Sequence, residues 1–182
     1  MIATITTTDE ELKQIVLLSH KNLRTNISEA QQAAQGFITW YYSLQLLQDM
    51  NAQHPHVIVK NGDTVIGYAL VALKEADQFH YDLKEMILHL DEVIYNNKKL
   101  SEYKYYVMGQ ICIDDAYRGK GVFEMLYHQH KKLFQNEYDF IVTEISTKNK
   151  RSLRAHEKLG FKTIYTYKNT LDEWSVVLWN WQ

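Results

Sequence analysis

The stretch from residue 105 to residue 123 constrains the fold most, because an apolar strand there runs into a two-glycine loop and then a helix. Tyr105–Ile113 reads as the strand, and Arg118–Phe123 (Arg-Gly-Lys-Gly-Val-Phe) begins the helix. Glycines let the backbone approach a ligand closely, and the free N–H groups of a helix start attract anions. Arg118 and Lys120 add positive charge. The stretch therefore indicates a phosphate site.

Length and composition predict one ordered domain over residues 1–182. The chain is 46% hydrophobic and 13% aromatic. A chain of this length buries roughly two-thirds of the surface that its unfolded form exposes. Its formal net charge is -2, whereas a general nucleic-acid binder is normally strongly basic. We therefore expect a globular domain with no nucleic-acid partner.

The sequence also indicates the cellular compartment of the protein. Cys112 is the one cysteine, so no internal disulfide can form, and a reducing compartment is expected. The first nine residues lack the basic-then-apolar pattern of a signal peptide. No apolar run approaches the ~20 residues that a bilayer-spanning helix needs. We therefore expect a cytoplasmic protein without a membrane partner.

Strand and helix patterns alternate along the chain and predict a mixed α/β domain, with one mixed sheet and helices on both faces. Ile2–Thr7 is β-branched, and Thr8 or Asp9 would cap a helix toward His20. Apolar spacing over residues 28–50 predicts a helix in two pieces that meet near Gly36. The other expected elements are strands at 56–60 and 64–73 around an Asn61-Gly62-Asp63 turn, helices at 76–97, 122–134 and 150–159, and strands at 138–145, 161–167 and 173–181.

The glycine loop does not match two common phosphate-binding patterns. The nucleoside-triphosphate loop needs a glycine where Asp114 stands and Ser or Thr where Gly121 stands. The dinucleotide fingerprint needs a third glycine where Glu124 stands. Taken alone, the loop fits either a ligand site or an ordinary surface turn.

A second segment, Thr147–Phe161, places polar residues at the start of an expected helix, and this pattern is informative together with the glycine loop. Asn149 and Ser152 lie at the start of an expected helix, and His156 follows one turn later. With both segments, the chain resembles the GCN5-related N-acetyltransferase (GNAT) family, which pairs an Arg/Gln-x-x-Gly-x-Gly/Ala loop with a downstream Asn helix ending in a Leu-Gly-Phe-like turn. The matching positions are Arg118, Gly121, Asn149, Ser152 and Leu159-Gly160-Phe161. The order of elements agrees over essentially the whole chain.

The resemblance implies a GNAT-like fold, with a mostly antiparallel mixed sheet of about seven strands that contains a splayed parallel pair. Two positions depart from the family pattern. Phe123 stands where the loop normally has Gly or Ala, so its side chain must point away from the phosphates. His156 stands where the family usually has a catalytic Tyr.

The resemblance also implies acetyl-CoA as cosubstrate, without a metal. The pantetheine arm would lie between the strand through Ile111–Ile113 and the strand through Ile141–Ile145, and one N–H near Ile111 or Cys112 would polarise the thioester carbonyl. The pyrophosphate would lie on the glycine loop. The implied cofactor-binding residues are Ile111, Cys112, Ile113, Arg118, Gly119, Lys120, Gly121, Val122, Phe123, Asn149, Ser152 and His156.

The implied reaction is direct attack of a primary amine on the thioester, which requires proton transfer. An alkylamine has a pKa near ~10.4, so a base or a water chain must take its proton. Glu144 is the candidate base, and the alternative is a solvated carboxylate at a strand end. His156 could protonate the leaving thiolate, or it could simply bond to nearby main chain. Cys112 lies mid-strand and is expected to be an inert, buried residue.

The acceptor is expected to be a small-molecule amine or a peptide. A helical insertion at 76–104 could form a lid over it, with Phe79, Tyr81 and Tyr103 as substrate contacts. The insertion could instead cover a sheet edge or mediate a homodimer. Two further alternatives stay open, a non-catalytic acyl-CoA sensor and a protein-interaction module. His54 and His56 lack a third ligand, so no metal site is expected.

Overall fold

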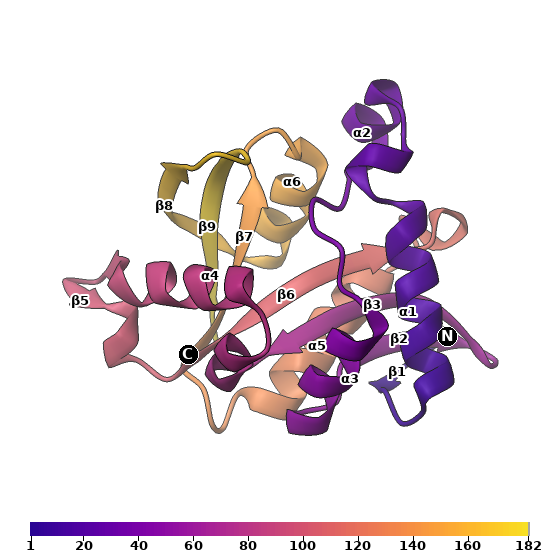
Figure 1. Ribbon diagram of the computed structural model, residues 1–182, viewed down its shortest axis with the longest axis horizontal. Coiled ribbons are helices and arrows are strands. Elements are labelled where there is room, and N and C mark those ends of the chain that lie inside the picture. Colours follow the sequence, from indigo (N-terminus) through magenta and orange to yellow (C-terminus); the bar gives the residue numbers. More distant parts are fainter. Residues whose placement is uncertain (182) are drawn as a thin grey trace.

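The computed structural model describes residues 1–181 and is built around a seven-stranded sheet (Figure 1). The strands lie in the order β1-β2-β3-β6-β7-β9-β8, and all neighbours are antiparallel except the parallel pair β6 and β7. This confirms the expected fold class. The strands are β1 (Ile2–Ile5), β2 (Val57–Asn61), β3 (Thr64–Ala72), β6 (Tyr105–Ile113), β7 (Phe140–Ser146), β8 (Lys162–Lys168) and β9 (Glu173–Asn180), with a small hairpin of β4 (Ile94–Tyr95) and β5 (Lys98–Lys99).

Helices cover both faces of the sheet, as Figure 1 shows. Apolar side chains of α1 (Asp9–Lys21), α3 (Leu44–Gln53) and α4 (Tyr81–Glu92) belong to one core cluster. Those of α5 (Val122–Phe134) and α6 (Lys150–Leu159) belong to a second cluster. The remaining helical segments are α2 (Glu29–Gln35) and the short 3₁₀ turns Arg24–Asn26, Lys74–Gln78, Leu100–Glu102 and Asp115–Tyr117. Two hydrophobic layers therefore hold the sheet from either side.

Helix-capping residues fix where the main elements begin and end. Thr8 caps α1 as expected, because its hydroxyl accepts from the Glu11 N–H while the Glu11 carboxylate accepts from the Thr8 N–H. Asn149 caps α6, and Gly160 ends that helix with a positive φ of 110°. These local signals explain why both expected helices lie where the sequence places them.

The expected break near Gly36 in the helical stretch 28–50 is confirmed, but the two helices do not meet there. Helix α2 ends at Gly36, which has a φ of 75°, and residues 37–43 are not helical. Ser43 then caps α3 by accepting from the Leu46 N–H. Within this segment, the backbone of Ile38 forms a parallel β-bridge with Leu23, and the side chains of Ile38 and Tyr42 pack in the core.

The expected helix over 76–97 is shorter than predicted. Its core is α4, which begins after His80, whose ring accepts from the Asp82 N–H. At the other end, Asn96 and Asn97 both have positive φ and form the turn of the β4–β5 hairpin. The helix itself ends at Glu92, because the backbone of Val93 is extended, with φ -67° and ψ 133°, although the side-chain pattern alone would continue the helix.

Strands β6 and β7 diverge, and this divergence creates the space for a site. They pair only through Tyr105–Val107 and Phe140–Val142. Strand β6 also carries an extra residue, because Ala69 pairs with Ile111 whereas Val71 pairs with Met108. Beyond Val107, the edge of β6 that faces β7 has no strand partner.

Three histidines are buried in the core and are uncharged at neutral pH. Burial lowers the pKa of His56 to about 4, of His130 to about 3 and of His156 to about 4. In an unfolded chain the same ring has a pKa of about 6.5. Between pH 6.5 and pH 4 the unfolded chain therefore binds protons that the folded protein does not, and the free energy of unfolding decreases as the pH falls.

We expect the free energy of unfolding, measured by urea titration, to be lower at pH 5 than at pH 7.5 by about 2–5 kcal/mol. Glu144 offsets part of this loss, because its pKa is raised in the folded protein. His130→Gln should reduce the pH dependence, whereas the same change at the exposed His128 should preserve it. An unfolding free energy independent of pH over this range would contradict the argument.

Candidate active site

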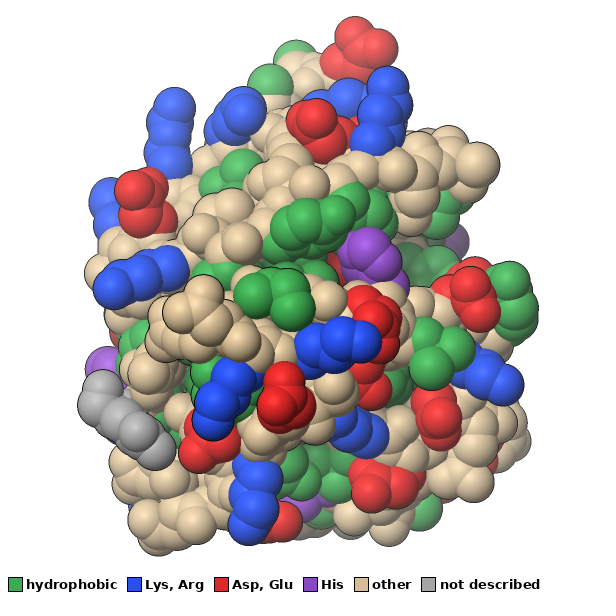
Figure 2. Space-filling view, turned by 90° about the vertical axis from the view of Figure 1, so that its left-hand side faces the viewer, with side chains coloured by type: hydrophobic (Ala, Val, Ile, Leu, Met, Phe, Trp, Pro, Cys, Tyr) green, Lys and Arg blue, Asp and Glu red, His purple; other side chains and the backbone are tan. Residues whose placement is uncertain are grey.

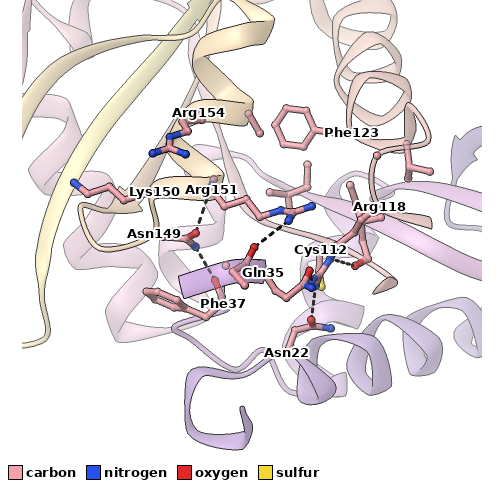
Figure 3. A pocket seen from close by; sticks show the side chains of 18 of the residues that line it. Asn22, Gln35, Phe37, Cys112, Arg118, Phe123, Asn149, Lys150, Arg151 and Arg154 are labelled. Atoms are coloured by element: carbon pink, nitrogen blue, oxygen red, sulfur yellow. Dashed lines mark hydrogen bonds between the residues drawn. The ribbon is translucent and has the colours of Figure 1, made fainter. Parts of the chain in front are cut away.

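A cavity of about 750 Å³, shown in Figure 3, lies beside the end of β6. Its walls come from the end of β6, the glycine loop, the first turns of α6 and the segment after α2. All of the predicted cofactor-binding residues line it except Lys120 and His156. Lys120 instead places its ammonium 5.4 Å from the centre of the Tyr117 ring. We call this space the cofactor cavity.

The glycine loop presents open backbone to the cofactor cavity. Gly119 and Gly121 have φ values of 72° and 81°, and a Cβ at either position would meet no atom within 4 Å. Glycine is needed there for the backbone conformation, since L side chains rarely adopt it. Gly121 precedes α5 and supplies no side-chain cap to the first turn. The N–H groups of that turn and the helix dipole are therefore available to an anion.

Arg118 holds the walls of the cofactor cavity together. Its Nε donates to the Ile113 carbonyl over 3.2 Å, and its two terminal nitrogens donate to Gln35 Oε1 and Asn22 Oδ1 over 2.6 and 2.7 Å (Figure 3). Asp115 Oδ1 lies 2.8 Å from the same guanidinium. Sequence reasoning missed Asn22 and Gln35, because they come from elements far from the loop in sequence.

The positive charge of the cofactor cavity comes mainly from α6. Lys150, Arg151, Arg154 and Lys158 lie along its rim. Their side chains are exposed, and Arg151 also donates to the Ala34 carbonyl over 3.0 Å. A single carboxylate, Glu124, lines the same space. The cavity therefore suits a ligand with several negative charges.

Asn149 and Phe123 have defined structural partners. Asn149 Oδ1 accepts from the Ser152 N–H over 3.3 Å, and its Nδ2 donates to the Phe37 carbonyl over 2.9 Å. Asn149 thus links α6 to the segment after α2. The Phe123 ring packs edge-on against Tyr127 and His156, with centroids 5.0 Å apart in both cases. Its bulk is accommodated in this aromatic cluster.

Cys112 is buried beside the cofactor cavity, and burial raises the pKa of its thiol to about 12. The sulfur is therefore protonated at neutral pH, as expected for an inert side chain. No group of three His, Cys, Asp or Glu side chains among residues 1–181 is arranged to hold a metal ion. Nor does this part of the chain contain a helix that is long and apolar enough to cross a membrane.

A second cavity of about 600 Å³ adjoins the first. The two share Phe37, Ile38, Ile111, Asn149 and Ser152 in their walls. The second is lined by the non-helical segment after α2, one face of α4, and residues of β6, β7 and β8. We call it the acceptor cavity, because a ligand in the cofactor cavity would reach it past Ile111.

Glu144 lies in the acceptor cavity with one oxygen unused. Its Oε2 accepts from the Tyr167 hydroxyl over 2.9 Å. Its Oε1 is buried and has no hydrogen-bond partner among the described residues. Burial raises the pKa of this carboxyl to about 7, although the Tyr167 hydrogen bond opposes that rise. Glu144 lies within β7, paired with Val176, so the description as a solvated strand-end carboxylate does not fit its position.

His156 also lines the acceptor cavity, but both ring nitrogens have protein partners. Nδ1 lies 2.8 Å from the Ser152 carbonyl oxygen, and Nε2 lies 2.6 Å from the Tyr127 hydroxyl. With its lowered pKa, the ring is neutral at pH 7. Nδ1 then donates to the carbonyl and Nε2 accepts from Tyr127.

The predicted substrate contacts lie outside the acceptor cavity. Phe79 packs against the hydrophobic core, and Tyr81 is 71% exposed. Tyr103 donates to the Tyr95 carbonyl over 3.1 Å. The insertion reaches the cavity through other residues, namely Asp82, Leu83, Glu85, Met86 and His89 of α4. Their helical spacing is a signal in the sequence that could have identified this face.

Comparison with known proteins decides the family. The family model described as the acetyltransferase (GNAT) family matches residues 26–161. The chain belongs to the GNAT acetyltransferase family. A search of curated proteins found no match.

Solved structures share the fold of this GNAT chain at low sequence identity. A structure of the NatC complex bound to Gag peptide and CoA aligns with a TM-score of 0.64 at 13% identity, covering 100% of this chain and 98% of that one. The ribosomal-protein-alanine N-acetyltransferase from Brucella melitensis gives 0.63 at 13% identity, with 99% of each chain covered. The putative acetyltransferase yncA from Salmonella typhimurium, with its cofactor acetyl-CoA, gives 0.61 at 14% identity, covering 100% of this chain and 95% of that one.

Proposed function

We propose that this GNAT protein transfers an acetyl group from acetyl-CoA to a primary amine by direct attack, with Glu144 as the general base. The observation that carries the proposal is the unpartnered, buried Glu144 Oε1 in the cavity that adjoins the cofactor cavity. A buried carboxylate oxygen without a donor is rare in proteins, because leaving it unpaired is costly. An amine N–H would supply the missing donor.

The residues of the cofactor cavity fit acetyl-CoA. The free edge of β6 can pair with the amides of an extended arm, the glycine loop with its open N–H groups can hold a pyrophosphate, and the cations of α6 can attract further phosphate. Acetyl-CoA supplies the thioester whose C–S bond breaks as the C–N bond to the amine forms. The bulged part of β6 between Met108 and Ile111 is our candidate for the N–H that stabilises the developing oxyanion.

Glu144 has a pKa suited to its proposed role. A base works best when its pKa lies near the working pH, and burial brings this carboxyl to about 7. Tyr167 holds the carboxylate in place from β8. The proton removed from the ammonium form of the acceptor passes to Glu144, and the leaving thiolate, with a thiol pKa of about 8.5, takes up a proton.

The acceptor class within this proposal is a primary amine of a small molecule or a peptide. One structure that shares the fold is the NatC complex bound to a Gag peptide, and another is a ribosomal-protein-alanine N-acetyltransferase. The test is to measure thiol release from acetyl-CoA with a panel of amines and peptides, beside CoA binding measured by calorimetry. Amine-dependent thiol release supports an enzyme, whereas CoA binding without turnover for any amine supports an acyl-CoA sensor.

For His156 we expect the substitution His156→Phe to lower turnover more than CoA affinity. The ring lines the acceptor cavity, but its proton faces the Ser152 carbonyl, so it can reach the thiolate only if that bond opens. Tyr127→Phe is the companion variant, because it removes the partner of Nε2 while keeping the imidazole. Unchanged turnover in His156→Phe would remove the residue from the mechanism and leave solvent as the proton source.

A further inference from the structure

The acceptor cavity and the cofactor cavity carry opposite charge. The cofactor cavity is lined by five basic residues, Arg118, Lys150, Arg151, Arg154 and Lys158, and one acidic residue. The charged residues of the acceptor cavity are the three acids Asp82, Glu85 and Glu144, and no Lys or Arg of the described chain lines it. A cavity with three carboxylates and no cation attracts a ligand with more positive charge than one reacting amine.

Two buried polar atoms in the acceptor cavity have no hydrogen-bond partner within residues 1–181. They are Glu144 Oε1 on β7 and His89 Nε2 on α4. One residue connects them, because Tyr167 donates to Glu144 Oε2 and its ring lies 4.0 Å from the His89 ring. Both open atoms can accept hydrogen bonds, the histidine as its Nδ1–H tautomer. The cavity therefore provides acceptors for at least two N–H groups and no cation for a carboxylate.

Two further carboxylates lie on the face of α4 that lines the cavity. Asp82, Glu85 and His89 are spaced so that they follow one side of the helix. Glu85 is exposed and has no hydrogen bond or ion pair among the described residues, and Asp82 lies 3.7 Å from His80 Nδ1. Glu85 in particular is available to a cation at the mouth of the cavity. The face drawn in Figure 2 carries hydrophobic and acidic side chains beside a histidine, with Lys or Arg side chains close by.

Much of the remaining lining is apolar or aromatic, with neutral polar side chains such as Gln110, Thr143 and Asn169 among it. Trp40, Met86, Met108 and Trp174 line the cavity together with Tyr42. Such walls suit methylene groups, and aromatic faces also attract ammonium groups. A peptide would also bring backbone carbonyls, and no Lys or Arg of the described residues lines the cavity to donate to them. The walls thus favour a flexible hydrocarbon chain with a nitrogen at each end.

We propose that the acceptor is a linear aliphatic diamine or polyamine, with its reacting amine at Glu144 Oε1 and a second ammonium group held by Glu85 and Asp82. In a polyamine, His89 Nε2 can also accept a hydrogen bond from a secondary amine N–H between the two ends. This proposal rests on the proposed acetyl transfer for the reaction, but the binding of the diamine does not require turnover. It names the substrate class that the proposed function leaves open.

The test compares three five-carbon amines that differ only at the far end. Cadaverine ends in an ammonium group, pentylamine in a methyl group and δ-aminovalerate in a carboxylate. In thiol-release assays we expect kcat/KM to be about tenfold higher for cadaverine than for pentylamine, and lowest for δ-aminovalerate. The double variant Asp82→Asn/Glu85→Gln should lower kcat/KM for cadaverine to about that for pentylamine in the same variant, so that most of the advantage of cadaverine is lost.

Glu92→Gln is the matched control, because Glu92 lies on the same helix, pairs with Lys99 and does not line the cavity. Equal kcat/KM for cadaverine and pentylamine, or an advantage that survives in the double variant, would overturn the proposal. So would faster acetylation of a peptide amine, although acetyl transfer itself would then stand.

Calorimetric titration of cadaverine into the CoA-saturated protein separates the two proposals. Binding that weakens about tenfold in the double variant, but without thiol release, would support the diamine site and count against acetyl transfer. Thiol release with pentylamine alone, and no cadaverine binding, would support acetyl transfer and overturn the diamine site.

Discussion

Glu144→Gln is expected to lower kcat by about 10²–10³-fold while leaving the affinity for CoA unchanged. General-base catalysis typically contributes an acceleration of this order. The amide keeps the size of the side chain and can still accept from the Tyr167 hydroxyl, so the fold should be preserved. Single-turnover thiol release measures the first effect, and calorimetry measures the second.

The pH profile gives a second measure of the role of Glu144. The carboxyl must be ionised to accept a proton, and its pKa is raised to about 7. For the native protein, kcat should therefore rise with pH through about 7, and this rise should be absent in Glu144→Gln. Tyr167→Phe removes a hydrogen bond that lowers the pKa of Glu144, so it should move the rise to higher pH.

Glu157→Gln changes an exposed carboxylate on α6 that lines neither cavity, and its kcat should equal that of the native protein. If Glu144→Gln keeps its kcat and its pH profile, the base is a different group or a water chain, and the proposed mechanism loses its central residue.

Gly121→Glu is expected to weaken CoA binding by about 100-fold or more. The residue has a φ of 81°, where a non-glycine residue costs about 1–2 kcal/mol, and it begins the helix whose N–H groups face the cofactor cavity. A carboxylate there would repel the phosphates that the loop is proposed to hold and would occupy the same N–H groups. Calorimetric titration with CoA measures the loss.

The variant Gly121→Gln separates the effect of the added charge on CoA binding from the effect of the added side chain. Glutamine has nearly the size of glutamate and imposes the same backbone strain, so the difference between the two variants reports the charge alone. We expect the glutamine variant to bind CoA about tenfold more tightly than the glutamate variant. Equal CoA affinity in the native protein and in Gly121→Glu would refute the assignment of the loop.

The elements and the glycine loop could be predicted because both depend on local patterns. The strand through Ile111, the capping residue Asn149 and the glycine pair are each recognisable within a few positions along the chain. The structure confirms these elements. It also confirms the parallel pair of strands, which was expected from the resemblance to the GNAT family and not from a local pattern.

Other parts of the site depend on tertiary contacts that no local pattern predicts. The environment of Glu144 depends on Tyr167 from β8, which reaches it across β9. Arg118 donates hydrogen bonds to Asn22 and Gln35, which lie in the first fifth of the chain. The helical spacing in residues 37–43 was misleading, because Gly36 and the Ser43 cap separate α2 from α3, and the apolar side chains pack from a non-helical segment.

The sheet is continuous across only three residue pairs between β6 and β7. On one side lie four strands and on the other side three, and beyond those pairs no backbone ladder joins them. A molecule bound in the gap would touch both parts, so its binding energy would add to their cohesion. The supply of acyl donor would then set how firmly the two portions of the enzyme stay together between one turnover and the next.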